Sequence, residues 1–519
     1  MLLSSILNRA VLLYPDKEAV CSGEHRFTYT EFKDRVNRLA HHLSESGIGK
    51  RDCVAVLLDN GHQFLEAYFA AARIGAILNP LNFRLSPREL GFIIKDSKAS
   101  LLIAATRFRD RVEGLKDLDI ELKQVIWSGT GQTYKGFRYI DYEDAIKGCT
   151  PGPLSDPGIS DREVAHLYYT SGTTGTPKGV MLTHNNIATH ALGTIAELNL
   201  TDRDVWIHAA PLFHLADAWA TFAITWVGGR HVMVPDFDPV NVLDIMDKEK
   251  VTLTNMIPTM LNMLVNTEKI SECDFRNLRV ILSGGAPIAP EIVRKIMNAF
   301  RCDYIQTYGM TETSPYLTLS VLKENLERLT PEERFRYKAM TGRPFIGVDL
   351  KVVGDDGKEV VPDGKGVGEI IVKGDTVTPG YWNRPEETEQ AFKDGWLYTG
   401  DIAVIDKEGY INIVDRKKDM IVTGGENVYS TEIENVLYMH PGILEAAVVG
   451  VPDKLWGEAV KACVVLKHEG TATEGDIIEF CKKNIASYKC PKSVVFLDEL
   501  PKVGSGKIFK KELKERYSD

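Results

Sequence analysis

An α/β protein with more than one domain is the fold class that the sequence predicts, on three observations. The chain has 519 residues, which exceeds what one hydrophobic core usually organises. Short apolar strand patterns alternate with helical patterns up to about residue 300. After residue 345 the alternation gives way to β-rich runs separated by turn signals. We therefore expect a large N-terminal region of sheets covered by helices, a smaller β module and a C-terminal α+β unit.

The first expected element is an amphipathic helix at the N-terminus. Its apolar run is interrupted by Asn8 and Arg9, so we interpret it as a helix and not as a signal peptide. Residues 53–60 then read as a buried strand, and residues 62–76 place their large apolar side chains on one helical face. The same order of strand and helix recurs at 99–104, near 205–226, and where 279–283 precedes a helix over 290–300.

The later part of the chain divides into two smaller units. Residues 345–415 carry the β-rich runs VDLKVVG, GEIIVKG and GYINIVD between glycine-containing turns, which predicts a mostly antiparallel module. The charged segment 415–419 (DRKKD) follows, and a short polar linker between two cores is where a rigid-body hinge is expected. Beyond it we expect a helix near 430–438, strands at 446–451 and 459–467, a helix near 474–487 and a strand at 493–497.

Charge and cysteine spacing argue against several classes of protein. A net charge of −10 disfavours nucleic acid as the main partner, because a phosphate backbone would be repelled. The eight cysteines are scattered without a C-x-x-C pair, which predicts neither a zinc site nor a disulfide framework and favours the cytoplasm. No apolar run reaches the length of a membrane-spanning helix, although peripheral contact with a membrane is compatible with the sequence. We expect a monomer or a homodimer.

Residues 168–179, YYTSGTTGTPKG, are the strongest local indication of chemistry. Small side chains allow backbone N–H groups to surround a polyanion, and Lys178 adds a positive charge. A run of this composition is otherwise typical of a flexible surface loop, but a strand at 164–169 leads into it and a basic residue ends it. We therefore predict a phosphate-binding loop. It is not a Walker loop, and the absence of G-x-S-x-G, H-E-x-x-H and a strand followed by G-x-G-x-x-G argues against hydrolase, zincin and dehydrogenase functions.

Motifs in a fixed order extend this indication along the chain: YTSGTTGTPKG (169–179), PLFH (211–214), SGGAP (283–287), QTYGMTET (306–313), GWLYTGD (395–401), DRKKDMIVTGGENVY (415–429) and PKVGSGKI (501–508). In these motifs the chain resembles the adenylate-forming superfamily of acyl-CoA synthetases, peptide-synthetase adenylation domains and luciferases. The resemblance covers nearly the whole chain. It implies an N-terminal domain over 1–417, built of two helix-covered sheets and a small β-barrel-like module near 345–415. A mobile α+β C-terminal domain over 418–519 would follow, with its hinge at Lys418.

The activity that the resemblance implies is that of an AMP-forming acyl-CoA synthetase. Attack of a carboxylate on the α-phosphorus of ATP gives acyl-AMP and pyrophosphate, and the thiolate of coenzyme A then takes the acyl group and releases AMP. Such a site needs a phosphate cradle, Mg²⁺, a cation beside the α-phosphate and a route for the thiol. The expected ligands are therefore ATP, Mg²⁺, coenzyme A and a small carboxylic acid.

The resemblance also assigns the nucleotide site residue by residue. Glu312 would bind Mg²⁺ with Thr170, and Thr311 would contact the α-phosphate. Asp401 would accept hydrogen bonds from both ribose hydroxyls, beside Arg416. The remaining contacts would come from Ser171, Gly172, Thr173, Thr174, Gly175 and Lys178 on the phosphates, and from Tyr308, Gly285, Ala286, Pro287, Gly309 and Met310 around the adenine, on which Tyr308 would stack.

Residues near the C-terminus would serve the two half-reactions in turn. Lys507 would neutralise charge between the carboxylate and the α-phosphate while acyl-AMP forms. The C-terminal domain would then swing about Lys418, and Gly424 and Gly425 would line the thiol channel, where side chains would obstruct it. Outside this family, a lysine in such a turn is usually a solvated charge, and a glycine pair is as often an ordinary tight turn.

The acyl group would lie beyond the α-phosphate, near His214. The resemblance places His214, Trp219, Ala220, Gly309 and Tyr316 around it. The stretch 215–229 is largely apolar and offers no cation to a second carboxylate, so we expect a medium- or long-chain fatty acid, or a cyclic or aryl acid. Asp217 departs from this apolar lining and keeps an amino acid as an alternative substrate.

Two further functions stay open at this point. The same acyl-AMP could be transferred to the phosphopantetheine arm of a carrier protein instead of coenzyme A. The chain could also be a non-catalytic protein that binds nucleotide or acyl groups, although Glu312, Asp401, Lys418 and Lys507 are all present, which argues against it.

Overall fold

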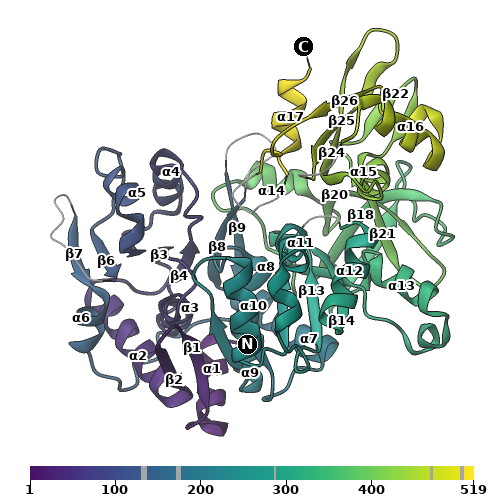
Figure 1. Ribbon diagram of the computed structural model, residues 1–519. Coiled ribbons are helices and arrows are strands. Elements are labelled where there is room, and N and C mark those ends of the chain that lie inside the picture. Colours follow the sequence, from purple (N-terminus) through teal and green to yellow (C-terminus); the bar gives the residue numbers. More distant parts are fainter. Residues whose placement is uncertain (130–136, 171–176, 286–287, 468–470, 503–507, 519) are drawn as a thin grey trace.

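The computed structural model describes residues 1–129, 137–170, 177–285, 288–467, 471–502 and 508–518 (Figure 1). Four β-sheets are found in these residues. Two large sheets with their helices make up most of the N-terminal part, an antiparallel sheet follows, and a further sheet with its own helices lies at the C-terminal end. The predicted fold class is therefore confirmed: an α/β protein with two helix-covered sheets, a β module and an α+β C-terminal unit.

The larger sheet has nine strands. Its inner strands pair in parallel, whereas β2, β15 and β16 pair antiparallel with their neighbours at the two ends. In spatial order the strands are β16 (Arg343–Pro344), β15 (Tyr316–Leu319), β14 (Asp303–Gly309), β13 (Val280–Ser283), β12 (Leu253–Met256), β10 (Val205–His208), β11 (Arg230–Met233), β1 (Glu18–Ser22) and β2 (His25–Thr28).

The second sheet has seven strands, and its pairs are parallel except for the last. That last pair, β8 with β9, is antiparallel and brackets the predicted phosphate loop. The spatial order is β7 (Arg138–Asp141), β6 (Gln124–Ser128), β5 (Leu101–Ala105), β3 (Cys53–Leu57), β4 (Ile77–Pro80), β8 (Val164–Thr170) and β9 (Lys178–Thr183).

Helices between and around these sheets bury two apolar cores. The first joins both sheets through α1 (Leu3–Leu13), α2 (Tyr29–Glu45), α3 (His62–Ile74), α7 (His184–Leu198) and α9 (Ala220–Val227). The second covers the opposite face of the nine-stranded sheet with α10 (Pro239–Lys248), α11 (Pro258–Val265) and α12 (Pro290–Phe300). The predicted helices over 62–76 and 290–300 correspond to α3 and α12. Other helices are α4 (Pro87–Ser97), α5 (Arg109–Glu113), α6 (Tyr142–Lys147), α8 (Leu215–Ala218), α13 (Pro331–Ala339) and α14 (Pro385–Ala391).

The predicted β module is a five-stranded antiparallel sheet. Its strands are β17 (Val348–Val353), β18 (Val367–Gly374), β19 (Phe392–Lys393), β20 (Trp396–Ile405) and β21 (Ile411–Arg416). Strand β21 pairs with β20, and its last two residues, Asp415 and Arg416, begin the charged segment 415–419.

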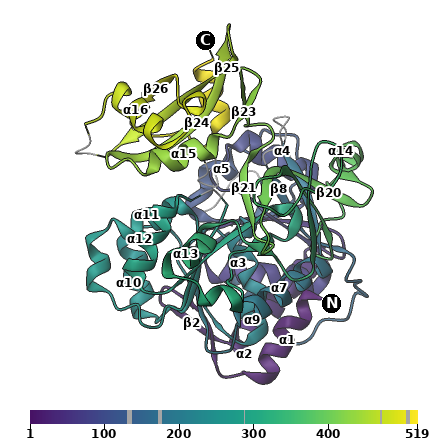
Figure 2. The same ribbon diagram turned by 90° about the vertical axis from the view of Figure 1, so that its right-hand side faces the viewer.

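The C-terminal unit has its own five-stranded sheet and sits at one end of the molecule (Figure 2). Its strands are β22 (Ile421–Thr423), β23 (Glu426–Val428), β24 (Ile443–Asp453), β25 (Gly457–Leu466) and β26 (Ser493–Phe496), packed with α15 (Ser430–Tyr438), α16 (Glu474–Asn484) and α17 (Lys510–Arg516). The helix expected near 474–487 ends at Asn484, because the backbone of Ile485 is extended. Nowhere in the described ranges is a helix long and apolar enough to cross a membrane.

Candidate nucleotide and acyl site

Asp401 connects two sheets at the predicted ribose position. The register of β20 and β21 sets Asp401 opposite Arg416, and the Nε atom of Arg416 lies 3.1 Å from Asp401 Oδ1. The hydroxyl of Tyr308, on β14 of the nine-stranded sheet, donates to Asp401 Oδ2 at 2.7 Å. Burial, followed by the charge of Asp401, raises the pKa of Tyr308. The structure thus brings together three predicted site residues that are separated in the sequence. The carboxylate of Asp401 at their centre is only 4% exposed.

Glu312 lies close in space to Lys178, which ends the predicted phosphate loop. It belongs to a short 3₁₀ turn, Thr311–Thr313, and its Oε1 accepts a hydrogen bond of 2.9 Å from the hydroxyl of Tyr381. The Nζ atom of Lys178 lies 5.3 Å from the centroid of the same Tyr381 ring. Thr170 pairs with Lys178 across β8 and β9. Lys178 and Glu312 therefore both approach Tyr381, while Thr170 pairs with Lys178 and Thr311 precedes Glu312 in the same turn.

Tyr381 is the residue of this group that sequence reasoning missed. Its segment is fixed by backbone bonds, from Thr378 N–H to the carbonyl of Glu312 at 2.7 Å and from Trp382 N–H to the carbonyl of Gly179 at 2.7 Å. The only local signal is the Pro379–Gly380 turn before it, which says nothing about a partner so distant along the chain.

The environment of Glu312 suits Mg²⁺. The side chain is a carboxylate, a hard oxygen ligand, and it is only 7% exposed. Tyr381 orients one of its oxygens, as the partners of metal-binding carboxylates commonly do. Glu312 with Thr170 would hold the ion, and bound Mg²⁺ would offset the negative charge of the ATP phosphates.

Several predicted residues lie outside the described residues: Ser171, Gly172, Thr173, Thr174, Gly175, Ala286, Pro287 and Lys507. Their roles stay predictions. The flanking residues Thr170 and Lys178 are described, and they pair with each other across β8 and β9.

The backbone at the ends of β13 and β14 explains two of the predicted glycines, Gly285 and Gly309. A Cβ atom on Gly309 would lie 1.9 Å from the carbonyl oxygen of Pro315, so no side chain fits there. Gly285 has a φ of +84°, which favours glycine. Met310 follows Gly309 in the sequence, and its N–H donates to the Pro315 carbonyl at 3.1 Å. These backbone needs place Tyr308 and Glu312 on either side of one tight turn.

An aromatic cluster occupies the predicted acyl end. The ring of Trp219 lies 4.9 Å from that of Trp206 and 5.4 Å from that of Tyr316, and the Tyr316 ring lies 5.1 Å from that of His190. All four side chains are buried. His214 is the N-cap residue of α8, and its Nδ1 accepts the N–H of Ala216 at 3.3 Å. Ala220 is buried at the start of α9.

Asp217 is fully engaged by protein groups. The indole Nε1–H of Trp206 donates to Asp217 Oδ1 at 3.0 Å, and Nδ1 of His208 lies 2.6 Å from Oδ2. The carboxylate is 0% exposed. It anchors α8 to β10, so its position argues against a salt bridge to the ammonium group of an amino acid.

Three buried histidines, one of them in this aromatic cluster, should make the protein less stable in mild acid. Burial lowers the pKa of His190 to about 3, where its Nε2 accepts the N–H of Tyr316 at 3.2 Å. Burial likewise lowers the pKa of His166 to about 3 and of His184 to about 4. The unfolded chain binds these protons below about pH 6.5 and the folded chain does not, so stability present above that pH is lost as the pH falls. We expect the free energy of unfolding to fall by at least about 2 kcal/mol from pH 7 to pH 5.

Urea denaturation at both pH values measures this effect. A His190→Gln variant should show a smaller pH dependence, because glutamine keeps an acceptor without titrating. The matched control is His25→Gln, at an exposed histidine, which should leave the slope unchanged. A stability that does not change between pH 7 and pH 5 would contradict the assignment of neutral buried histidines.

The predicted thiol loop is a tight hairpin turn. Gly424 and Gly425 join β22 to β23 with φ values of +60° and +84°, so the backbone itself requires glycine there. A Cβ atom on Gly424 would also lie 2.9 Å from the ring of Trp456. Lys418 lies exposed in the turn between β21 and β22, which belong to different sheets. The channel and the hinge stay predictions.

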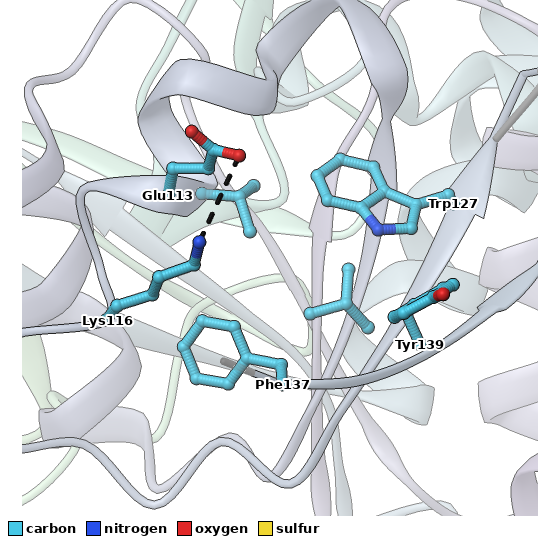
Figure 3. A pocket seen from close by; sticks show the side chains of 7 residues that line it. Glu113, Lys116, Trp127, Phe137 and Tyr139 are labelled. Atoms are coloured by element: carbon cyan, nitrogen blue, oxygen red, sulfur yellow. Dashed lines mark ion pairs between the residues drawn. The ribbon is translucent and has the colours of Figure 1, made fainter. Parts of the chain in front are cut away.

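A small pocket at the edge of the seven-stranded sheet is separate from these residues (Figure 3). It lies beside β6 and β7, and the ion pair between Glu113 and Lys116 flanks it. None of the predicted site residues that the structure describes lines it.

Comparison with known proteins gives matches along nearly the whole chain. A family model described as "AMP-binding enzyme" matches residues 7–382, and one described as "AMP-binding enzyme C-terminal domain" matches residues 432–507. Feruloyl-CoA synthase of Amycolatopsis sp is 37% identical over 98% of both chains. Long-chain-fatty-acid–CoA ligase FadD13 of Mycobacterium tuberculosis is 35% identical over 96% of this chain and 94% of that one.

A solved relative is available with and without nucleotide. ATP-bound MatB from Rhodopseudomonas palustris is 30% identical, with a TM-score of 0.85 over 99% of both chains. Apo MatB from the same organism, also 30% identical, gives a TM-score of 0.77 over 100% of this chain and 99% of that one. The arrangement of this chain is thus more similar to the ATP-bound form.

Proposed function

This chain belongs to the AMP-binding enzyme family and is an ATP-dependent, AMP-forming CoA ligase, and from that premise we propose that its acid substrate is apolar. ATP and coenzyme A are the other substrates of this ligase. The proposed acid is a medium- or long-chain fatty acid, or a cyclic or aryl acid.

The observation that carries this proposal is the surroundings of Asp217. It is the only charged residue in the stretch 215–229, and its carboxylate is bound by Trp206 and His208 inside the protein. The neighbouring Trp219 and Tyr316 present aromatic rings. Within residues 215–229, all of which are described, no other charged side chain is present, so a second carboxylate or an ammonium group on the acid would meet this stretch at a high desolvation cost.

The nucleotide would be held by the residues gathered around Asp401 and Glu312. Asp401, oriented by Tyr308 and Arg416, would accept hydrogen bonds from the ribose, and Lys178 would pair with the phosphates. Lys507 would supply the positive charge as the carboxylate oxygen attacks the α-phosphorus and pyrophosphate leaves. We further propose that the present arrangement serves this first half-reaction, because it is more similar to the ATP-bound relative than to the apo form.

A panel of carboxylic acids tests the proposal. Fatty acids from C2 to C18, benzoate and cyclohexanecarboxylate are each incubated with ATP, Mg²⁺ and coenzyme A, and AMP release is measured. Malonate and phenylalanine serve as charged controls. We expect AMP release with one or more apolar acids and little with the controls. A clear preference for malonate or phenylalanine would refute the apolar assignment.

Two measurements separate the alternative functions. Turnover with coenzyme A and with a phosphopantetheinylated carrier protein identifies the acceptor, and we expect coenzyme A to be used. Acid-dependent exchange of pyrophosphate into ATP reports acyl-AMP formation alone. A non-catalytic binding protein would show no exchange with any acid.

A further inference from the structure

Asp415 connects the β module to the C-terminal unit. It is the next-to-last residue of β21 and is only 3% exposed. Its Oδ2 accepts the backbone N–H of Ser430 at 2.6 Å, and its Oδ1 accepts the Ser430 hydroxyl at 3.1 Å. Ser430 is the first residue of α15, whose N-cap residue Tyr429 makes no side-chain cap. A carboxylate from another sheet therefore caps this helix and complements the positive end of its dipole.

Lys510 extends the same network to the last helix. Its Nζ donates to the Ser430 hydroxyl at 2.7 Å and lies 2.7 Å from Glu434 Oε1. The same Glu434 oxygen accepts the N–H of Val448 on β24 at 2.7 Å. The hydroxyl of Ser430 thus receives a hydrogen bond from the ammonium group and donates one to Asp415. A continuous chain of hydrogen bonds runs from β21 through α15 to the start of α17.

The residues at the two ends of this hydrogen-bond network lie on opposite sides of the proposed hinge in the sequence. Asp415 precedes Lys418, whereas Ser430, Glu434 and Lys510 follow it. Asp415 is also adjacent to Arg416, which pairs with Asp401 in the nucleotide site. The network therefore joins the ribose position to the C-terminal unit. Burial raises the pKa of both Asp415 and Glu434, and the nearby Lys510 lowers it again, so each carboxylate depends on its partner.

We propose that Asp415 and Lys510 are positioning residues that hold the C-terminal unit in the arrangement for acyl-AMP formation. This inference rests on the proposed function and on rotation about Lys418. Lys510 reaches Asp415 through the Ser430 hydroxyl and through its positive charge, which lowers the pKa of Asp415. The contacts between Asp415 and Ser430 must break before the unit can rotate to the arrangement for thiol transfer. The network favours one half-reaction at the expense of the other.

Measuring the half-reactions separately tests this role. An Asp415→Asn variant keeps the shape but loses the charge and turns an N–H donor toward Ser430 or Arg416. We expect acid-dependent pyrophosphate exchange to fall by at least about fivefold relative to transfer from preformed acyl-AMP to coenzyme A. Lys510→Met should also lower the ratio of pyrophosphate exchange to acyl transfer. Lys510→Arg keeps the positive charge and should bring this ratio part of the way back to the wild-type value. Combining Asp415→Asn with Lys510→Met should cost less than the product of the single effects, since both break one network.

Lys514→Met is the matched control. Lys514 lies on the same helix α17, and its Nζ is 2.8 Å from Glu458 Oε1, a residue that also follows Lys418. This ion pair would move as one body during rotation, so its loss should leave the ratio of half-reactions unchanged. If Asp415→Asn slows both half-reactions equally, or if Lys514→Met changes the ratio as much, the positioning role is wrong.

Limited proteolysis gives a readout that does not depend on the acid. Residues Arg416, Lys417 and Lys418 are exposed and offer trypsin sites in the turn between the two sheets. We expect Asp415→Asn to raise cleavage there by at least about fivefold, with Lys514→Met close to wild type, because cleavage follows the population of the open form. Unchanged cleavage at this turn would overturn the inference. Failure of the proposed function would appear differently, as a wild-type protein that forms no acyl-AMP with any acid.

Discussion

Replacing Lys507 with alanine should lower the rate of acyl-AMP formation by about 10²–10³-fold or more. The reacting carboxylate and the phosphates all carry negative charge, and this lysine is the predicted cation between them. Lys507 itself lies outside the described residues, but the chain around it is anchored, since Lys502 pairs with Ile508 in an antiparallel bridge and Phe509 N–H donates to the Pro501 carbonyl at 2.7 Å. Transfer from preformed acyl-AMP to coenzyme A should change little, because Lys507 would have left the site by then.

Pyrophosphate exchange measures the first step, and single-turnover thioester formation measures the second. The matched control is Lys502→Ala. Lys502 belongs to the same segment, and its Nζ lies 2.7 Å from Glu445 Oε1. This variant should keep most of the exchange activity. An alanine variant of Lys507 that forms acyl-AMP at the wild-type rate would remove the central element of the mechanism.

Replacing Glu312 with glutamine should lower the use of MgATP by about 100-fold or more. Glutamine keeps the shape of the side chain and an oxygen that can accept from Tyr381, but it loses the charge that binds Mg²⁺. A metal ion that neutralises phosphate charge contributes several kcal/mol, and about 1.4 kcal/mol corresponds to tenfold in rate. The rate of pyrophosphate exchange as a function of Mg²⁺ concentration should show a weaker dependence on the ion and a lower maximum.

The Tyr381→Phe variant separates charge from orientation. It keeps the carboxylate of Glu312 and removes only the hydroxyl that positions it, so we expect a smaller loss of roughly tenfold, mainly in Mg²⁺ affinity. Equal activity of Glu312→Gln and wild-type protein at low Mg²⁺ would refute the metal assignment. Equal losses in the two variants would show that geometry, and not charge, dominates at this position.

The sequence predicted the elements well where local pattern and packing agree. The run at 62–76 places its large apolar residues on one face, and α3 buries that face together with most of its other side chains; Pro290 opens α12 as expected. The order of strands was beyond local reasoning, because β1 pairs with β11 about two hundred residues later. Such pairing depends on how two sheets share a core, which no window of the sequence contains.

The site residues also differ in how far the sequence alone could identify them. The residues predicted to bind the sugar and the metal could be proposed from the sequence because each stands in a motif. The structure brings Tyr308, Asp401 and Arg416 together, and their roles stay predictions. Tyr381 was missed because its partner Glu312 lies far away in the sequence. Asp217 stayed ambiguous because its surroundings decide its role, and both Trp206 and His208 come from a different element.

The turn at Lys418 separates strands of two different sheets, and this has a consequence for how such ligases diverge. The residues proposed to meet the acid are encoded before that turn, and those proposed to deliver the cation and admit the thiol are encoded after it. Mutations that adapt the protein to a new acid can accumulate in the first segment while the second is inherited intact. A hybrid gene joined at this turn would have to preserve the match between Asp415 on one side and Ser430 and Lys510 on the other.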